Sequence, residues 1–321
     1  MKKLGIIVCG QPRFIKYTWK FIKEQYTIPG YETKYFGHLW DGVGYSKNND
    51  INDKYEPHEI SDNIANDFTK LKIDKYKNLN TSIIDFYSQA RGYIPKEKAV
   101  RAKRYHFGQV YSKQEAYNIL QKYEKQTSTM FDVIVVIKTD FIYKNNKKKQ
   151  QLFDISNEKD LVKTISASIV EYNSNLNSLS RRGVFSYIKE HERAQRVINN
   201  PNSFYRLRIN CHWLLLGRRA AHVMLGEWYK TALQIAKESK EQPLLWKRIN
   251  SMGTMYGEII LRNNLKVQKG NPRLYRIINK DNFFNQNCRE RSIQAKKPFI
   301  TCMFQDIKTE QNNLQEQLLK I

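Results

Sequence analysis

The sequence predicts an α/β protein whose central sheet is mostly parallel and carries helices on both faces. The first 42 residues contain an apolar strand, an amphipathic helix and a second strand, in the order of a parallel strand–helix–strand unit. Residues 133–137 are consecutive β-branched side chains, which are typical of a strand buried on both faces. With 321 residues the chain can bury a sizeable core, as one large domain or two closely joined halves.

The amino-terminal unit is predicted from its periodicity. Residues 4–9 form an apolar strand that ends in a Gly-Gln-Pro turn at 10–12. A helix follows, because apolar residues recur at helical spacing: Ile15, Trp19, Ile22 and Tyr26. The Pro-Gly pair at 29–30 ends this helix, and residues 35–40 form a second strand closed by Asp-Gly at 41–42.

A polar segment follows, from residue 45 to about residue 94. Its few apolar residues predict an excursion from the sheet with short helices, or a mobile flap. A basic cluster comes next: Lys96, Lys98, Arg101, Lys103 and Arg104. We therefore place the excursion at 45–105. Residues 109–123 then form an amphipathic helix that leads to the β-branched strand.

The second half of the chain again alternates strands and helices. A strand at 213–216 ends at Gly217, a helix follows, and another helix around 252–259 leads into a strand at 265–267. After Asp306 a polar helix has one apolar side, which docks on the body or on a partner. The expected units are two halves, 1–160 and 161–304, and a terminal helix at 305–321.

Charge is the strongest compositional signal. Lysine and arginine number 55 against 31 acidic residues, which leaves a net charge of +24. Such an excess concentrates anions around the protein and speeds association with them. Lysine-rich and asparagine-rich usage from an AT-rich genome is the alternative explanation.

The cysteines and the amino terminus indicate a cytoplasmic protein. The cysteines are Cys9, Cys211, Cys288 and Cys302. None forms a CxxC pair, so a disulfide framework or a structural zinc site is not expected. No apolar run approaches the ~20 residues of a membrane span. The first apolar stretch is too short for a signal peptide and lacks a small-residue cleavage site.

The sharpest local motif is Ile137-Lys138-Thr139-Asp140, at the carboxyl end of the β-branched strand. In open α/β sheets, ligands bind outside this end of the strands. A carboxylate there can hold a divalent cation that in turn holds a diphosphate, and Lys138 can contact a phosphate directly. The alternative is that Asp140 caps a turn or pairs with Lys138.

A second motif, Gly10-Gln11-Pro12-Arg13, ends the first strand at the same edge. Glycine lets the backbone approach a base or ribose closely, and Arg13 offers planar, charged donors to a phosphate or carboxylate. The motif is neither a Walker loop nor a GxGxxG fingerprint, so ATP or dinucleotide binding gains no support. A plain turn with a surface arginine is the alternative.

Other polar residues near predicted strand ends are weaker candidates. His38, Trp40 and Asp41 close the second strand, where an aromatic ring either stacks on a base or packs in the core. His212 is either a base or a satisfied core histidine. Glu258, on an apolar helix, either pairs with Arg262 at i+4 or points into the site as a base.

These segments, in this order, resemble a group of bacterial and viral glycosyltransferases of the GT-A type. The family pattern Tyr-Asp-Val-Ile-x-x-Arg-x-Asp is similar to Phe-Asp-Val-Ile-Val-Val-Ile-Lys-Thr-Asp at 131–140. The other matching segments are Gly10-Gln11-Pro12-Arg13-Phe14, His38-Leu39-Trp40 with Asp41, Ser112, Tyr123-Glu124, Asn210-Cys211 through Gly217, and the helix with Glu258.

The resemblance implies a GT-A-like, Rossmann-type sheet and a nucleotide-sugar donor, with UDP-sugar expected. It places the base and ribose near residues 10–13 and Ser112, and the diphosphate with Mn²⁺ or Mg²⁺ near Asp140. Residues 1–160 would then be the donor half and 161–304 the acceptor half. Lys138 replaces the family's arginine, so it neutralises phosphate without a two-pronged contact.

A second departure from the family pattern concerns the base. Cys211 stands where the family has an acid. An inverting reaction would therefore take its base from elsewhere, in the order Glu258, His212, Asp41. A retaining reaction would need no such base.

Basic residues of the second half suggest a polyanionic acceptor. Clusters stand at Lys144 with Lys147-Lys148-Lys149, Arg181-Arg182, Lys189, Arg193 and Arg196, Arg206 with Arg208, Arg218-Arg219, and Arg273 with Arg276. Phosphate neutralisation dominates nonspecific affinity for DNA. Some tailed phages glycosylate hydroxymethylcytosine in their DNA, so double-stranded DNA is the first expectation. An enzyme would then enter the major groove or flip the base.

Three alternatives to a DNA-modifying enzyme remain at this stage. A glycosyltransferase for a surface glycan or lipopolysaccharide would not need +24. A non-catalytic DNA-binding protein has the same charge but no reason to place Asp140 and residues 10–13 at strand ends. A nuclease ranks lowest, because no two-metal Asp…(Asp/Glu)-x-Lys pattern surrounds Lys138.

Overall fold

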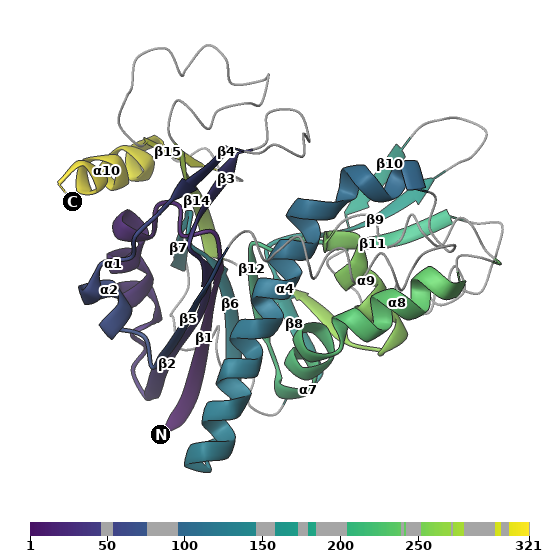
Figure 1. Ribbon diagram of the computed structural model, residues 1–321, viewed down its shortest axis with the longest axis horizontal. Helices are drawn as coiled ribbons and strands as arrows, with labels where there is room; N and C mark the ends of the chain where they lie inside the picture. Colours follow the sequence, from purple (N-terminus) through teal and green to yellow (C-terminus); the bar gives the residue numbers. More distant parts are fainter. Residues whose placement is uncertain are drawn as a thin grey trace.

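The computed structural model confirms an α/β fold with a seven-stranded central sheet (Figure 1). It describes residues 1–45, 54–75, 96–145, 158–172, 179–183, 204–238, 241, 252–270, 272–278, 299–302 and 308–320. The sheet order is β13 (Lys266–Lys269), β8 (Leu161–Thr164), β12 (Trp213–Leu216), β6 (Val133–Lys138), β1 (Lys2–Gly10), β2 (Tyr31–Trp40) and β5 (Lys70–Asp74).

Strand direction makes one edge of this sheet the natural place for a site. β1 pairs in parallel with β2 and β6, β2 with β5, and β8 with β13. β12 runs antiparallel to both of its neighbours, β6 and β8. Six strands therefore end at the same edge, which we call the carboxyl edge, and β12 begins there. The sheet is mostly parallel, as expected, and β12 is its one reversed strand.

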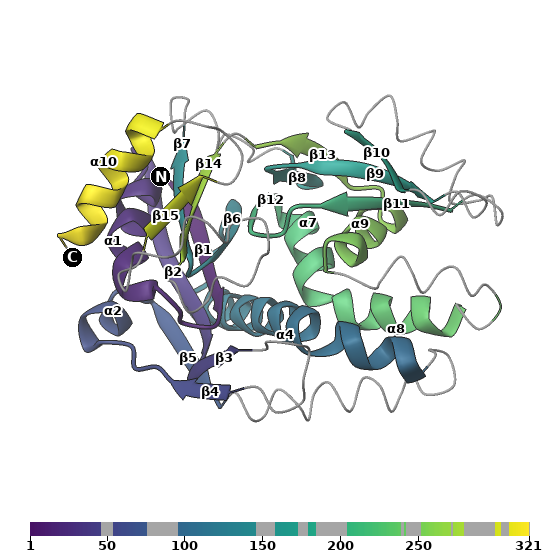
Figure 2. The same ribbon diagram turned by 90° about the horizontal axis from the view of Figure 1, so that it is seen from above.

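Helices cover both faces of the sheet, as predicted. On β1, Leu4, Ile6 and Val8 pack against α1 (Ile15–Tyr26), while Ile7 faces the cluster that contains α4 (Lys96–Thr127). This alternation follows from the two-residue period of a strand. The second layer also contains α7 (Arg218–Ala221), the π-helical turn η2 (His222–Gly226), α8 (Trp228–Glu238) and α9 (Met252–Arg262) (Figure 2).

The segment expected as an excursion at 45–105 contributes to the sheet. It starts at the last residue of β3 (Gly42–Tyr45), its described residues then form β4 (Lys54–Pro57), α2 (Asp62–Asn66) and β5, and α4 already begins at Lys96. β5 is an edge strand with mostly exposed or half-buried side chains. An edge strand of this kind is polar in sequence, which explains why the apolar pattern failed to predict it.

The expected boundary at residue 160 does not divide the central sheet. β8, β12 and β13 follow that residue yet lie in the same sheet as β1 and β6. Two small sheets flank it: β10 (Leu179–Gly183), β9 (Ala167–Tyr172) and β11 (Phe204–Ile209), and β15 (Phe299–Cys302), β14 (Pro272–Ile278) and β7 (Phe141–Asn145).

The terminal helix packs against the body of the protein. The terminal helix α10 (Lys308–Leu319) docks on the body through the fully buried Leu314, which clusters with Phe21 of α1 and Tyr275 of β14. Within the described ranges, no helix has the length and apolar character of a membrane span.

Candidate active site at the carboxyl edge

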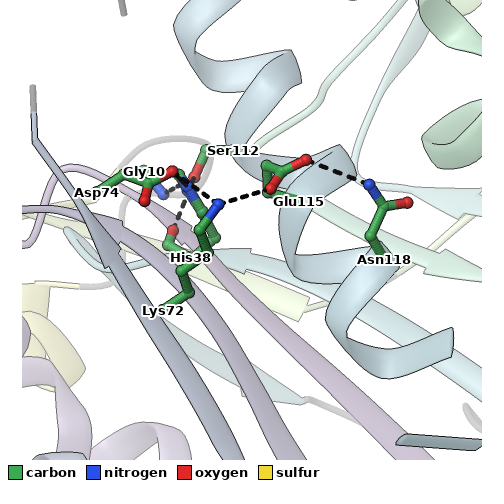
Figure 3. Close-up of polar contacts among 7 residues, drawn as sticks. All are labelled: Gly10, His38, Lys72, Asp74, Ser112, Glu115 and Asn118. Atoms are coloured by element: carbon green, nitrogen blue, oxygen red, sulfur yellow. Dashed lines mark hydrogen bonds and ion pairs between the residues drawn. The ribbon is translucent and has the colours of Figure 1, made fainter. Parts of the chain in front are cut away.

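A buried serine joins three elements at the carboxyl edge (Figure 3). The Ser112 hydroxyl of α4 accepts a hydrogen bond from the Gly10 backbone N–H (2.8 Å), at the end of β1. It donates to the carbonyl oxygen of His38 on β2 (2.7 Å) and lies 2.9 Å from His38 Nδ1. Ser112 therefore fixes α4 against the ends of β1 and β2.

The other nitrogen of His38 leads into a network of charged residues. His38 Nε2 lies 2.9 Å from an Asp74 carboxylate oxygen at the end of β5. Lys72 Nζ is 2.9 Å from both Asp74 and Glu115, the latter one turn after Ser112 on α4. Burial would raise the pKa of Asp74, but its bonds from His38 and Lys72 outweigh burial and hold the pKa below its usual value.

This network has the spacing of a metal site but holds an ammonium group. Ligand atoms of His38, Asp74 and Glu115 lie within 4.8 Å of one another. The Lys72 ammonium already bonds both carboxylates, so a cation would have to displace a paired charge. We therefore interpret the cluster as an ion-pair network that positions His38 and Ser112.

The Ser112–His38–Asp74 sequence of contacts also resembles a hydrolytic triad, but its environment does not support that chemistry. Ser112 is fully buried, and its oxygen is already engaged with the Gly10 N–H and the His38 carbonyl. A nucleophilic serine needs an exposed oxygen beside its base. The contacts serve positioning.

The charge state of His38 predicts a pH dependence of stability. Burial lowers the pKa of His38, although its hydrogen bond to Asp74 acts in the opposite direction. The unfolded chain therefore binds a proton more readily below pH 6.5, and stability is lost as the pH falls through that window. We expect the free energy of unfolding to decrease between pH 7 and pH 5, and to decrease less in His38→Gln.

Urea unfolding at each pH tests this expectation. His222→Gln, which replaces a histidine with a 55% exposed side chain, is the matched control and should keep the wild-type slope. His58 also has a pKa lowered by burial, so part of the slope should remain in His38→Gln. An unchanged slope in that variant would contradict the assignment of a neutral, buried His38.

The two sequence motifs at strand ends are joined by threonine hydroxyls. Thr139 Oγ1 donates to the Gln11 carbonyl oxygen (2.5 Å), and Thr18 Oγ1 donates to the Thr139 carbonyl oxygen (2.7 Å). Arg13 Nε donates to Gln11 Oε1 (2.7 Å). Gly10 has φ +108°, a conformation that favours glycine, and a Cβ there would meet no atom of the described residues within 4 Å. These hydrogen bonds connect residues 10–13 to the segment that follows β6.

Lys138 and Asp140 lie on the same turn. Asp140 is 8% exposed, and Lys138 is partly buried. Burial lowers the pKa of Lys138 to about 8, and the Asp140 carboxylate only partly offsets this effect. The Tyr143 hydroxyl accepts from the Lys138 backbone N–H and donates to the His212 carbonyl oxygen, both at 2.9 Å. His212 therefore lies at this edge too, with its ring 4.7 Å from Phe141.

The remaining candidates for a base differ in position. Asp41 follows β2 at the carboxyl edge, where its backbone N–H donates to the Asp74 carbonyl oxygen (2.9 Å). Glu258 is buried and accepts from Arg262 Nε (3.0 Å), which is the pairing alternative of the sequence analysis. Glu258 also lies six residues, about 9 Å, along α9 from Met252. Met252 contacts Lys113, the residue after Ser112 on α4.

Sequence had suggested that arginines of the second half contact the acceptor, and the structure separates them. Arg218 pairs with Glu124 (2.5 Å) and Arg219 with Asp160 (2.6 Å), at the opposite edge of the sheet. In the small β10–β9–β11 sheet, Arg181 and Arg206 both pair with Val170 and Arg182 pairs with Ile169. Arg208, on β11, is exposed. Residues 146–150 and 184–200, with their basic clusters, lie outside the described residues.

Several residues at the edge were not predicted from sequence. Asp74 and Lys72 belong to the polar edge strand, and Glu115 and Lys113 sit beside Ser112 on α4. Ser112 and Glu115 are three residues apart, which is the spacing of one helix face, and this could have suggested the pair. Lys113 was hidden among the many lysines of a basic chain.

Comparison with known proteins adds a fold-level likeness. No family model matches the sequence, and no curated protein matches it. Among solved structures, the chain is similar to mouse xyloside xylosyltransferase 1 in its apo form. The TM-score is 0.39 at 10% sequence identity, over 84% of this chain and 85% of that one. The fold assignment rests on the strand order and not on this likeness.

Proposed function

We propose that the protein is a glycosyltransferase that moves a sugar from a nucleotide-sugar donor to an acceptor hydroxyl. The supporting observation is the meeting of motif residues from distant segments at the carboxyl edge. Ser112 bonds Gly10, and Thr139 bonds Gln11. Ligands of open α/β sheets bind at this edge.

The donor would lie along the turns of this edge. Residues 10–13 and Ser112 would frame the base and ribose, and Lys138 would neutralise the diphosphate. One carboxylate with substrate phosphates is a donor set that suits Mg²⁺ or Mn²⁺, so Asp140 fits a cation that is shared with the diphosphate. Such a cation would stabilise charge on the leaving diphosphate when bound.

An acceptor base, if the reaction inverts, has to reach the acceptor hydroxyl. His212 and Asp41 lie at the carboxyl edge, whereas Glu258 is paired with Arg262 further along α9. We therefore place His212 and Asp41 ahead of Glu258, which moves Glu258 from the first to the last of the three candidates.

The acceptor we propose is polyanionic, with hydroxymethylated bases of double-stranded DNA as the first candidate. The net charge of +24 supports this choice, because such a surface binds a phosphate backbone strongly at low salt. Arg181, Arg206 and Arg208 stand on the small sheet, away from the ion pairs that hold Arg218 and Arg219. A surface glycan is the alternative acceptor.

A donor panel tests this proposal. The protein is incubated with a panel of radiolabelled nucleotide sugars, UDP-sugars among them, and Mn²⁺, together with plain DNA, hydroxymethylated DNA or no DNA. We expect one donor to be consumed and its label to be transferred to hydroxymethylated DNA. This transfer should decrease when the salt concentration is raised. Donor consumption without DNA would favour the glycan acceptor. Tight DNA binding with no consumption of any donor would contradict the enzyme and favour a non-catalytic DNA-binding protein.

A further inference from the structure

A second lysine at the carboxyl edge places its charge among neutral groups. Lys113 is fully buried, and its Nζ donates to the Cys211 carbonyl oxygen (3.0 Å) and to Met252 Sδ (3.4 Å). The same atom lies 5.1 Å from the centre of the Tyr256 ring. Burying a charge is costly unless it is paired, and none of these partners carries an opposite charge.

Lys113 and Lys138 lie on neighbouring elements at the carboxyl edge. Lys138 of β6 pairs with Cys9 of β1 in the sheet, and Lys113 bonds the carbonyl of Cys211, two residues before Trp213, which pairs with Ile137. Cys9 precedes Gly10, where a Cβ would meet no atom of the described part of the chain within 4 Å. Two positive charges therefore converge next to the turn that the donor would contact.

A buried donor without a partner lies beside them. The Tyr256 hydroxyl is fully buried and makes no hydrogen bond among the described residues. Tyr256 stands one turn after Met252 on α9, so both residues face Lys113. A buried hydroxyl that makes no hydrogen bond destabilises the fold, unless a ligand or a water molecule accepts a hydrogen bond from it.

We propose that Lys113, Lys138 and the Tyr256 hydroxyl form one anion-binding site for the phosphates of the donor. This inference rests on the proposed function and adds Lys113 and Tyr256 as binding residues. A diphosphate oxygen beside Gly10 would be attracted by both ammonium groups and would accept a hydrogen bond from the tyrosine hydroxyl. The phosphates thereby supply a negative charge, which none of the described partners of Lys113 carries.

The test uses inorganic pyrophosphate and UDP as separate probes in calorimetric titrations of the full chain. Lys113→Met keeps the apolar stem and removes the charge, and we expect it to raise the Kd for both probes at least about tenfold. Tyr256→Phe should raise the Kd severalfold while its melting temperature stays the same or rises, because no internal hydrogen bond is lost. Lys266→Met removes an exposed charge at the opposite edge and should bind as the wild type does.

The outcomes separate this inference from the proposed function. Pyrophosphate binding that depends on Lys113, in a protein that consumes no UDP-sugar, supports the site and contradicts the enzyme. Donor turnover with unchanged pyrophosphate affinity in Lys113→Met contradicts the site and leaves the enzyme standing. Equal weakening in Lys113→Met and Lys266→Met, or no binding to the wild type, would also overturn the site. If Lys113→Met fails to fold, Tyr256→Phe decides.

Discussion

Replacing Asp140 with asparagine is expected to lower donor consumption about 100-fold or more. The substitution keeps the size of a buried side chain at the end of β6 and removes its charge. A carboxylate at this position is the only proposed means of holding a cation on the leaving diphosphate. Initial rates with saturating donor and Mn²⁺ measure the effect.

Asp160→Asn is the matched control for this variant. Asp160 is a half-exposed aspartate at the opposite edge, paired with Arg219, and surface ion pairs of this kind contribute little to stability. It should retain the wild-type rate. Full activity in a folded Asp140→Asn protein would remove Asp140 from the site.

Replacing Gly257 with alanine is expected to destabilise the protein by about 3 kcal/mol or more. A Cβ at Gly257 would overlap the carbonyl oxygen of Leu207, and one at Gly253 would lie 2.6 Å from the Ile209 carbonyl oxygen. α9 thus packs directly on β11, an edge strand of the small β10–β9–β11 sheet. A Cβ at Gly257 fits only if one of these two backbones moves away from the other. Alanine favours a helix by about 1 kcal/mol over glycine, so a net loss reports the overlap.

Urea unfolding of Gly257→Ala beside Gly226→Ala measures this effect. A Cβ at Gly226 meets its nearest atom, in the Tyr117 ring, at 3.4 Å, which is ordinary contact. That variant should unfold like the wild type or be slightly more stable. Equal stability of all three proteins would show that α9 does not pack this closely on β11.

The sequence predicted those elements whose burial leaves a clear pattern of apolar residues. The strand at 133–137 is buried on both faces, and α1 has one apolar face, so both were found from sequence. β5 was missed because an edge strand needs few apolar residues. Pairing between strands far apart in the sequence leaves no local pattern, so the place of β8, β12 and β13 in the same sheet as β1 was not predicted either.

The candidate site was predictable in its backbone positions and less so in its charges. Gly10 and Asp140 stand at strand ends, which chain order alone indicates. The pairing of Glu258 with Arg262 was one of two alternatives, and only the structure decides between them. Lys113 could not be distinguished from surface lysines, because its burial depends on contacts with Cys211 and Met252, distant in sequence.

Hydrogen–deuterium exchange with and without the consumed donor tests the central claim most directly, because it reports where the ligand binds whatever the acceptor. We predict slower exchange at residues 9–13, 111–114 and 138–141, where β1, α4 and β6 meet. Protection confined to other segments, with none at the carboxyl edge, would contradict the proposed donor site.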